Sequence, residues 1–172
     1  MKSEYLNPFI VAAAEVLRKE VGASVKRGQV GLKRGLYVSD DVTVLISLVG
    51  QIEGTVLFHM AYDTAKRLVS AILDQPFDRF DELAQSGISE LANVITGLSS
   101  TKLAEAGLVS IISVPMLIIG KGSRISTLQV DRVVVPLETE LGCISLDLAL
   151  RENPDAPDTF ARYNPDVATL QM

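Results

Sequence analysis

The segment SGISELANVITG, residues 86–97, places a carboxylate, a carboxamide and two small residues on one side of a helix. This side is formed by Ser86, Glu90, Asn93 and Gly97, which recur at helical spacing. A carboxylate can pair with a cation, and an amide both donates and accepts hydrogen bonds, so the pair could bind a charged partner and hold a water molecule. Asn is a mediocre helix former, and Gly in a helix interior costs about 1 kcal/mol relative to Ala. Helix stability therefore does not explain why these four residues occur together. For any single Glu/Asn pair, the simpler interpretation would be a solvent-exposed surface whose residues have no selected function.

The opposite side of the same segment is apolar. It carries Ile88, Leu91, Ile95 and Leu98, at steps of three, four and three residues. This spacing is typical of an amphipathic helix that packs one side on a core. We expect the helix to run over about residues 81–106, because strand-like sequence follows it.

The remaining chain divides into helical and strand-like segments. The other predicted helices cover residues 8–21 and 64–73. The predicted strands cover residues 23–32, 43–48, 54–60, 108–119, 123–136 and 141–150. Strands joined by short connections pair antiparallel, so we expect an α+β fold in which long helices pack on a mainly antiparallel sheet.

The order of these segments repeats. Residues 4–73 and residues 86–150 each show a long helix followed by strands, which predicts two pseudo-symmetric repeats within one domain, residues 1–150. In the first repeat Glu4 and Asn7 lie over Glu90 and Asn93. Asn7 directly precedes Pro8, the arrangement of an N-cap with proline at the first helical position, so we expect a structural role for Asn7. Residues 151–172 are polar and hold three prolines, and we expect a surface tail.

Composition limits the class of protein. The chain has 172 residues, the length of one ordinary domain, and a net charge of -5, which disfavours nucleic acid or an anionic membrane as the main partner. Hydrophobic residues make up 48% and the mean hydropathy is +0.29, which suggests apolar surface covered in an oligomer. No apolar stretch reaches the roughly 18 residues that span a bilayer, and no signal peptide is evident, so we expect a cytoplasmic protein without membrane insertion.

The residues of common catalytic and metal sites are scarce. The chain has one histidine, His59, and one cysteine, Cys143, which we expect to be a small core residue. A metal site of its own is therefore not predicted. The glycine-rich stretch GKGSR, residues 120–124, follows an apolar run and precedes strand-like sequence, which predicts a hairpin turn. A small basic cluster, formed by Lys26, Arg27, Lys33 and Arg34, is interpreted as a solvated strand and turn.

Ser86, Glu90 and Asn93, followed 22 residues later by Pro115 in a strand-like run, resemble the signature of the CheC/CheX/FliY phosphatases of bacterial chemotaxis. The resemblance covers essentially residues 1–150 and is nearest to CheX. It implies hydrolysis of the aspartyl phosphate of a CheY-type response regulator. In that role Asn93 would hold the attacking water and Glu90 would pair with a partner lysine. Ser86, Gly97 and Pro115 would form the surrounding partner-binding surface.

The resemblance also implies that Mg²⁺ is supplied by the response regulator and that the chain forms a homodimer through its β structure. The first repeat departs from the signature, since Gln29 or Val30 stands where a proline would be expected, and a second active site is not predicted. An alternative is a non-catalytic module that binds a response regulator, as a flagellar-switch or adaptor protein would. A purely structural dimer would explain the apolar composition but not the polar side of residues 86–97.

Overall fold

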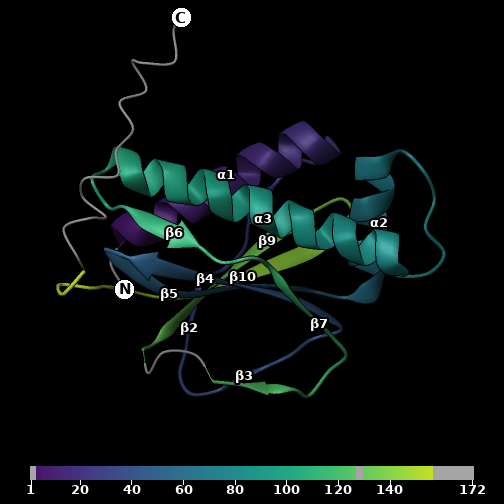
Figure 1. Cartoon of the computed structure of the whole chain (residues 1–172). Coiled ribbons are helices and arrows are strands. Elements are labelled where there is room, and N and C mark those ends of the chain that lie inside the picture. The colour runs from purple at the N-terminus through teal and green to yellow at the C-terminus, as the bar shows by residue number, and fades with distance from the viewer. Residues whose placement is uncertain (1–2, 127–129, 157–172) are drawn as a thin grey trace, which may run out of the picture.

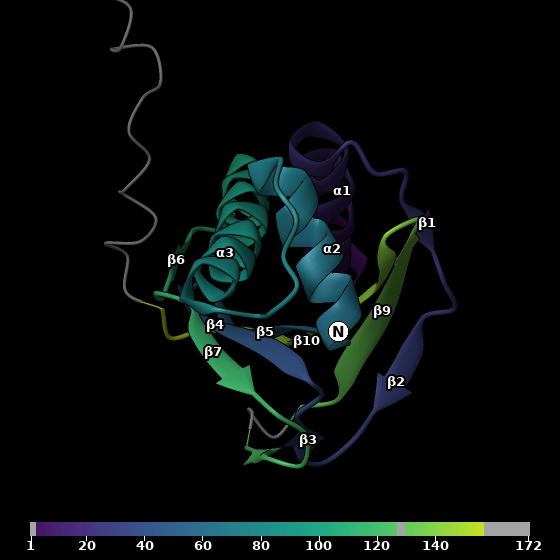
Figure 2. The same cartoon turned by 90° about the vertical axis from the view of Figure 1, so that its right-hand side faces the viewer.

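The computed structural model describes residues 3–126 and 130–156, in which three helices cover one face of an antiparallel sheet (Figures 1 and 2). The helices are α1 (Ser3–Val21), α2 (Tyr62–Leu73) and α3 (Glu82–Glu105). The strands are β1 (Lys26–Arg27), β2 (Gly31–Lys33), β3 (Tyr37–Val38), β4 (Val42–Gly50), β5 (Ile52–Met60), β6 (Ser110–Ile112), β7 (Met116–Ile119), β8 (Arg124–Ile125), β9 (Arg132–Thr139) and β10 (Gly142–Glu152). The predicted α+β class is confirmed.

The main sheet has the order β1-β9-β10-β5-β4-β6, with β2 also pairing with β9 and β7 with β4. Its centre consists of two hairpins, β4–β5 and β9–β10, which meet where β5 pairs antiparallel with β10. Each hairpin follows a long helix and short strands, so the structure shows the predicted pseudo-symmetry. Gly54 and Gly142, which coincide when the two halves are aligned, both have positive φ and no room for a Cβ atom.

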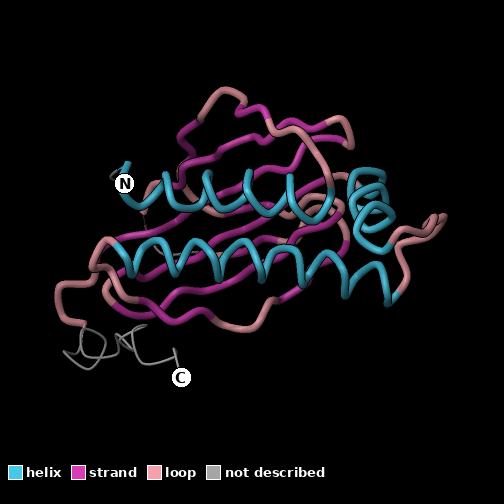
Figure 3. Tube along the Cα trace, turned by 90° about the horizontal axis from the view of Figure 1, so that it is seen from above, coloured by secondary structure: helices cyan, strands magenta, loops and turns pink. Residues whose placement is uncertain are grey.

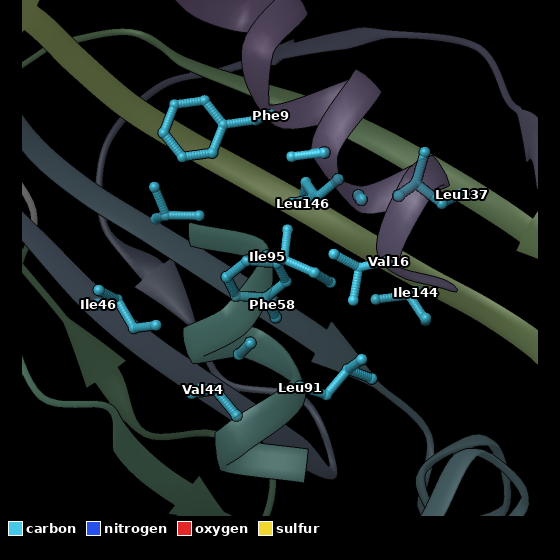
Figure 4. Close-up of a cluster of buried hydrophobic side chains, with 14 of the residues drawn as sticks. Phe9, Val16, Val44, Ile46, Phe58, Leu91, Ile95, Leu137, Ile144 and Leu146 are labelled. Carbon is cyan, nitrogen blue, oxygen red and sulfur yellow. The ribbon is translucent and has the colours of Figure 1, made fainter. Parts of the chain in front are cut away.

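The core lies between the helices and this sheet. Figure 4 shows Phe9 and Val16 of α1 and Leu91 and Ile95 of α3 gathered around the sheet residue Phe58. All five side chains are at most 6% exposed. The apolar stripe predicted for residues 86–97 thus packs on the sheet, and the polar stripe faces away from it.

Helices α1 and α3 lie side by side and run in opposite directions (Figure 3). Lys102 of α3 forms an ion pair with Glu15 of α1 at 3.2 Å. Helix α2 packs against α3 at Gly87, where a Cβ atom would lie 3.3 Å from Cγ2 of Val69. Helices α1 and α2 therefore hold α3 on two sides.

The predicted start of the first helix is wrong. α1 begins at Ser3, so Asn7 and Pro8 lie inside it, and Asn7 is exposed rather than an N-cap. The physical reason is tertiary packing. Tyr5 is 3% exposed and its hydroxyl donates to Oε2 of Glu152 at 2.8 Å, which stabilises a helical turn before the proline.

Two predicted single strands are each divided. The segment 23–32 contributes to β1 and β2, which are separated at Gly28, whose amide donates to the Pro136 carbonyl at 2.8 Å. The segment 108–119 contributes to β6 and β7, which pair with different parts of β4. Pro115 lies in the interruption, because it has no amide hydrogen to donate to a sheet.

The hairpin predicted at GKGSR is also wrong. The turn follows β7, which pairs with β4, and precedes β8, which pairs with β3 in a separate two-stranded sheet. β8 is only part of the predicted strand 123–136, because β9 begins at Arg132. The predicted tail starts too early, since β10 continues to Glu152, and residues 157–172 of the tail lie outside the described residues.

Candidate active site

Helix α3 is held firmly at its start. The Oδ1 atom of Asp81 accepts a hydrogen bond from the Ala84 amide at 2.9 Å, which satisfies one of the unpaired amides of the first turn. The predicted limits of this helix are confirmed within one residue at each end.

The buried side of α3 combines apolar residues with two hydroxyls that bond to their own helix. Its members are Ala84, Ile88, Leu91, Ala92, Ile95, Thr96, Ser99 and Leu103. Thr96 donates to the Ala92 carbonyl at 2.8 Å and Ser99 to the Ile95 carbonyl at 2.7 Å. Because the buried polar groups are satisfied within the helix, α3 can pack closely on the sheet and fix the direction of its outer side chains.

The outer side of α3 brings four of the predicted site residues together. Ser86, Glu90, Asn93 and Gly97 fall within an arc of about 60° at 3.6 residues per turn, and we call this set the α3 ridge. Ser86 and Glu90 are exposed, whereas Asn93 and Gly97 are half-buried. Nδ2 of Asn93 donates to Oε2 of Glu90 at 3.4 Å. The amide nitrogen thus faces the carboxylate, which leaves Oδ1 of Asn93 to accept a hydrogen bond from water.

Gly97 is not required by the packing of the monomer. It has a regular helical backbone, and the nearest atom to an added Cβ would be Cδ1 of Ile112 at 3.9 Å, an ordinary contact distance. Alanine would fit this position and favour the helix. The absence of a side chain at Gly97 therefore leaves space on the outer surface of the ridge and is not needed for folding.

Two depressions flank the ridge. The polar trough, of about 570 Å³, lies between α3 and β7. Its lining consists of Glu82, Gln85, Ser86, Ser89, Glu90, Pro115 and Leu117. The structure therefore places Pro115 beside Ser86 and Glu90 in the lining of this trough, whereas Asn93 and Gly97 do not line it.

The second depression, the apolar groove, has a volume of about 470 Å³ and lies where α3 meets α1 and α2. Its lining consists of Val16, Glu20, Ile72, Leu73, Leu83, Ser86, Gly87, Glu90, Leu91 and Val94. Leu83 and Val94 are 52% and 40% exposed. This groove was not predicted from the sequence. Its available signal was the position of Leu83 and Val94 on α3, outside the buried stripe.

The remaining candidate residues lie elsewhere. Cys143 is exposed, so its prediction as a core residue is wrong. The alternation of β10 turns the neighbouring Ile144 into the core and Cys143 outward. Within residues 3–126 and 130–156, no group of three or more His, Cys, Asp or Glu side chains could hold a metal ion.

Residues 42–138, which include Glu90, Asn93 and Pro115, match the family model described as chemotaxis phosphatase CheX. The chain belongs to the CheX family. It is 28% identical over 128 residues to the CheY-P phosphatase CheX of Thermotoga maritima, a match that covers 74% of this chain and 83% of that protein. The resemblance inferred from the α3 residues and Pro115 is confirmed.

Solved structures of CheX proteins share the fold. The CheX chain of the CheX–CheY–BeF₃–Mg²⁺ complex from Borrelia burgdorferi is 29% identical, with a TM-score of 0.74 over 86% of this chain and 98% of that one. CheX from Desulfovibrio desulfuricans is 23% identical, with a TM-score of 0.77 over 86% and 99% of the two chains, and supports the fold alone. Among the described residues of this CheX family member, none of the helices combines the length and the apolar character that a membrane span requires.

Proposed function

We propose that this CheX family member hydrolyses the aspartyl phosphate of a phosphorylated CheY-type response regulator in the cytoplasm. The observation that carries the proposal is the hydrogen-bonded Glu90–Asn93 pair on the α3 ridge, in which Glu90 is exposed and Asn93 is half-buried. The activity in the name of the Thermotoga maritima relative and the partner in the Borrelia burgdorferi complex support the same reaction class.

In this reaction the oxygen of a water molecule forms a bond to phosphorus while the bond from phosphorus to the aspartyl carboxylate oxygen breaks. The electron pair of the broken bond stays on the carboxylate, so the regulator regains its aspartate. The other product is inorganic phosphate, and the proton lost by the water passes to phosphate or to solvent. No covalent intermediate on the phosphatase is required.

Asn93 supplies orientation rather than a base. Its Nδ2 is engaged by Glu90, so its Oδ1 accepts a hydrogen bond from the attacking water and aims the water lone pair at phosphorus. An amide does not ionise near neutral pH, and it therefore positions the water without removing a proton. Orientation of a nucleophile can lower a barrier by several kcal/mol.

Glu90 requires a cation from the partner. A carboxylate alone would repel the phosphoryl group, whereas a carboxylate paired with a lysine beside the phosphorylation site fixes the register of docking. Glu90 is exposed, so the contact forms at the surface of the ridge without prior burial of the charge. Its second carboxylate oxygen remains for that contact while Oε2 holds Asn93.

Mg²⁺ in this proposal enters with the response regulator. The Borrelia burgdorferi complex contains Mg²⁺ together with CheY. The described residues of this chain include no ligand cluster around the ridge that would hold the ion. Bound with the regulator, Mg²⁺ would supply charge neutralisation for the phosphoryl oxygens.

The partner-binding surface in this proposal extends over the ridge and both depressions. Ser86 and Gly97 are small, so a concave partner surface can close over the ridge and reach Asn93. Pro115 bounds the polar trough on one side, and Leu83 and Val94 offer apolar contact on the other. Burial of those two side chains would favour binding in the same way as folding does.

We also propose a homodimer that covers the edge of the sheet at β6 and β7. Ile111, Val114 and Met116 are 62%, 84% and 59% exposed there. Ile111 and Met116 alternate with residues that face the helices, so they lie on the opposite face and a second copy would leave the α3 ridge open. We expect Met116→Glu to convert the dimer to a monomer in sedimentation equilibrium. A wild-type monomer at micromolar concentration would contradict the proposal.

The experiment that tests the function combines binding with turnover. Phosphorylated response regulators of the same organism are mixed with the protein, and inorganic phosphate release and complex formation are measured in parallel. We expect one regulator to lose phosphate far faster than it does alone. Tight binding of phosphorylated regulators without faster phosphate release would instead support the non-catalytic binding module.

A further inference from the structure

The two-stranded sheet of β3 and β8 lies on the side of the main sheet away from the helices, where Figure 1 shows β3 below the main sheet. We call this pair of strands the flap. It consists of two residue pairs, Tyr37 with Ile125 and Val38 with Arg124. None of these residues lines the polar trough or the apolar groove, so the proposed phosphatase chemistry does not explain the flap.

One buried side chain anchors the flap to the main sheet. Tyr37 is 4% exposed, whereas the other three residues of the two pairs are exposed or half-buried. The hydroxyl groups of Tyr37 and of Thr43 in β4 lie 3.1 Å apart and share a hydrogen bond. A segment that buries so little apolar surface can separate from the domain without global unfolding.

The flap is also joined to the end of β7. The Gly120 amide donates to the Asp41 carbonyl at 2.8 Å, and Oγ of Ser39 donates to the Gly120 carbonyl at 2.7 Å. Nζ of Lys121, a side chain that is 66% exposed, lies 3.5 Å from Oδ1 of Asp41. Leu117 of β7 lines the polar trough, so the flap is attached to a strand of the proposed docking surface.

His59 of β5 lies against the anchoring tyrosine. Its ring meets the Tyr37 ring edge-on, with 5.6 Å between the centres, and its side chain is 16% exposed. Nδ1 lies 3.8 Å from Oδ2 of Asp40, within the range of an ion pair. Nε2 is buried and has no hydrogen-bond partner among the described residues. A protonated ring carries hydrogen on both nitrogens, so its Nε2–H would have no acceptor in the closed flap.

The surroundings of His59 disfavour its charged form. Burial lowers the pKa of His59 below the ordinary value of 6.5, Asp40 opposes this effect, and Lys33 and Arg132 add to it. A proton on the ring thus adds a positive charge that burial and two cations oppose and one carboxylate favours. Other charged groups nearby are paired with each other: Arg132 with Asp147, Arg34 with Asp131, and Lys121 with Asp40 and Asp41.

We propose that the flap is a pH-sensitive cover of the main sheet, which opens on acidification when His59 takes up a proton from solvent. Opening separates Tyr37 from the ring and lets water accept the hydrogen bond of Nε2. The open state restores the ordinary pKa of His59, so the closed flap is fully stable above pH 6.5 and becomes less stable as the pH falls below that value. Uptake of one proton favours opening by up to about tenfold per pH unit.

Two other groups of this cluster have shifted pKa values, and they respond differently to acid. Burial raises the pKa of Asp147, although Arg132 lowers it, so protonation of Asp147 would stabilise the closed flap. Burial also raises the pKa of Tyr37 above 10, outside the acidic range. Opening in mild acid is therefore assigned to His59.

Hydrogen exchange of backbone amides, followed by NMR, measures the opening. The flap reporters are the amides of Ser39, Gly120 and Gly122, which donate to the carbonyls of Ser123, Asp41 and Ser39. The reference amides are those of the β5–β10 pair at the centre of the main sheet. Protection factors are compared, because they remove the pH dependence of the chemical exchange step. We expect the flap amides to be less protected than the reference amides, with protection falling several-fold from about pH 7 to about pH 5.

His59→Gln is the test variant, because glutamine keeps a polar side chain but does not titrate. We expect flap protection near that of the wild type at neutral pH, and we expect the loss of protection in acid to be absent. An unchanged loss in acid would overturn the proposal. Flap amides as well protected as the β5–β10 amides would also overturn it, and that comparison needs only the wild-type protein.

The chain has one histidine, so its ring signals in an NMR spectrum report the pKa of His59 directly. Asp40→Asn and Asp41→Asn form a matched pair, because both carboxylates pair with Lys121 but Asp40 is the one beside the ring. We expect Asp40→Asn to lower the pKa of His59 further and Asp41→Asn to leave it unchanged. A wild-type pKa at or above 6.5, or equal values in the two variants, would contradict a ring enclosed between Asp40 and the flap and would overturn the proposal.

Discussion

The side-chain amide of Asn93 donates to the carboxylate of Glu90 across 3.4 Å, on the side of α3 that faces away from the sheet. This hydrogen bond pairs the two side chains in the free protein, and α3 itself is anchored by its buried stripe. In the proposed function, activity and stability are therefore carried by opposite sides of one helix, and substitutions can separate them.

Asn93→Ala should lower activity without lowering stability. The variant loses the oxygen that we propose orients water, so we expect dephosphorylation of the cognate regulator to slow by about 10²-fold or more. Ala is the best helix former, so the free energy of unfolding should stay equal or rise by a few tenths of a kcal/mol. Phosphate-release kinetics and urea unfolding measure the two effects. A wild-type rate in this variant would remove Asn93 from the mechanism.

Asn7→Ala is the matched control in the first repeat. Because Asn7 lies exposed inside α1 and is not an N-cap, we expect a small gain in the free energy of unfolding in place of the roughly 1 kcal/mol loss that a cap would give. The rate of dephosphorylation should not change. A loss near 1 kcal/mol in urea unfolding would indicate that Asn7 does cap a helix in solution.

Gly97→Ala should make the protein more stable and the enzyme worse. The methyl group has room beside Ile112 and favours the helix, so we expect the free energy of unfolding to rise by about 0.5–1 kcal/mol. The same methyl group raises the surface of the ridge at the proposed partner contact, so KM for the phosphorylated regulator should increase. Gly87→Ala is the control for the gain in stability. Its added Cβ would lie 3.3 Å from the Val69 side chain, so we do not expect the free energy of unfolding to rise. Unchanged KM in Gly97→Ala would argue against partner contact at this position.

Leu83→Ser and Val11→Ser compare two equally exposed apolar side chains, at 52% and 51%. Leu83 lines the apolar groove and Val11 does not. We expect Leu83→Ser to weaken complex formation several-fold, since less apolar surface is buried with the partner, while Val11→Ser behaves as wild type. Calorimetric titration of the phosphorylated regulator measures both. If both variants bound the phosphorylated regulator with the same affinity, the apolar groove would be excluded from the interface with the regulator.

Much of the fold could be predicted because the spacing of apolar residues indicates which side of each helix or strand is buried. Ile88, Leu91 and Ile95 are at most 6% exposed, as their helical period indicates. The errors arose where contacts distant in sequence decide the structure. Tyr5 extends α1 past Pro8 by its contact with Glu152, and nothing in the local sequence shows that contact.

In the candidate site, too, the features that depend on local spacing could be predicted, and those that depend on distant contacts could not. The members of the α3 ridge are local to one helix, so their common side followed from spacing alone. The two depressions beside it depend on which elements pack next to α3. The apolar groove combines Val16 and Ile72 with Leu83, and the strand-like run around Pro115 did not indicate that β7 would line the polar trough. Spacing within one segment carries no information about such neighbours.

The hydrogen bond from Tyr5 to Glu152 brings the first turn of α1 against the last residue of β10. The order of the segments along the chain could therefore be changed without changing their arrangement in space. A short peptide linker could join these two positions, and new termini could be opened in the segment between α2 and α3, residues 74–81. The resulting circular permutant would exchange the order of the two repeats while keeping every strand pair and the α3 ridge. Its native folding would show that the assembled sheet, rather than the order of synthesis, determines the structure.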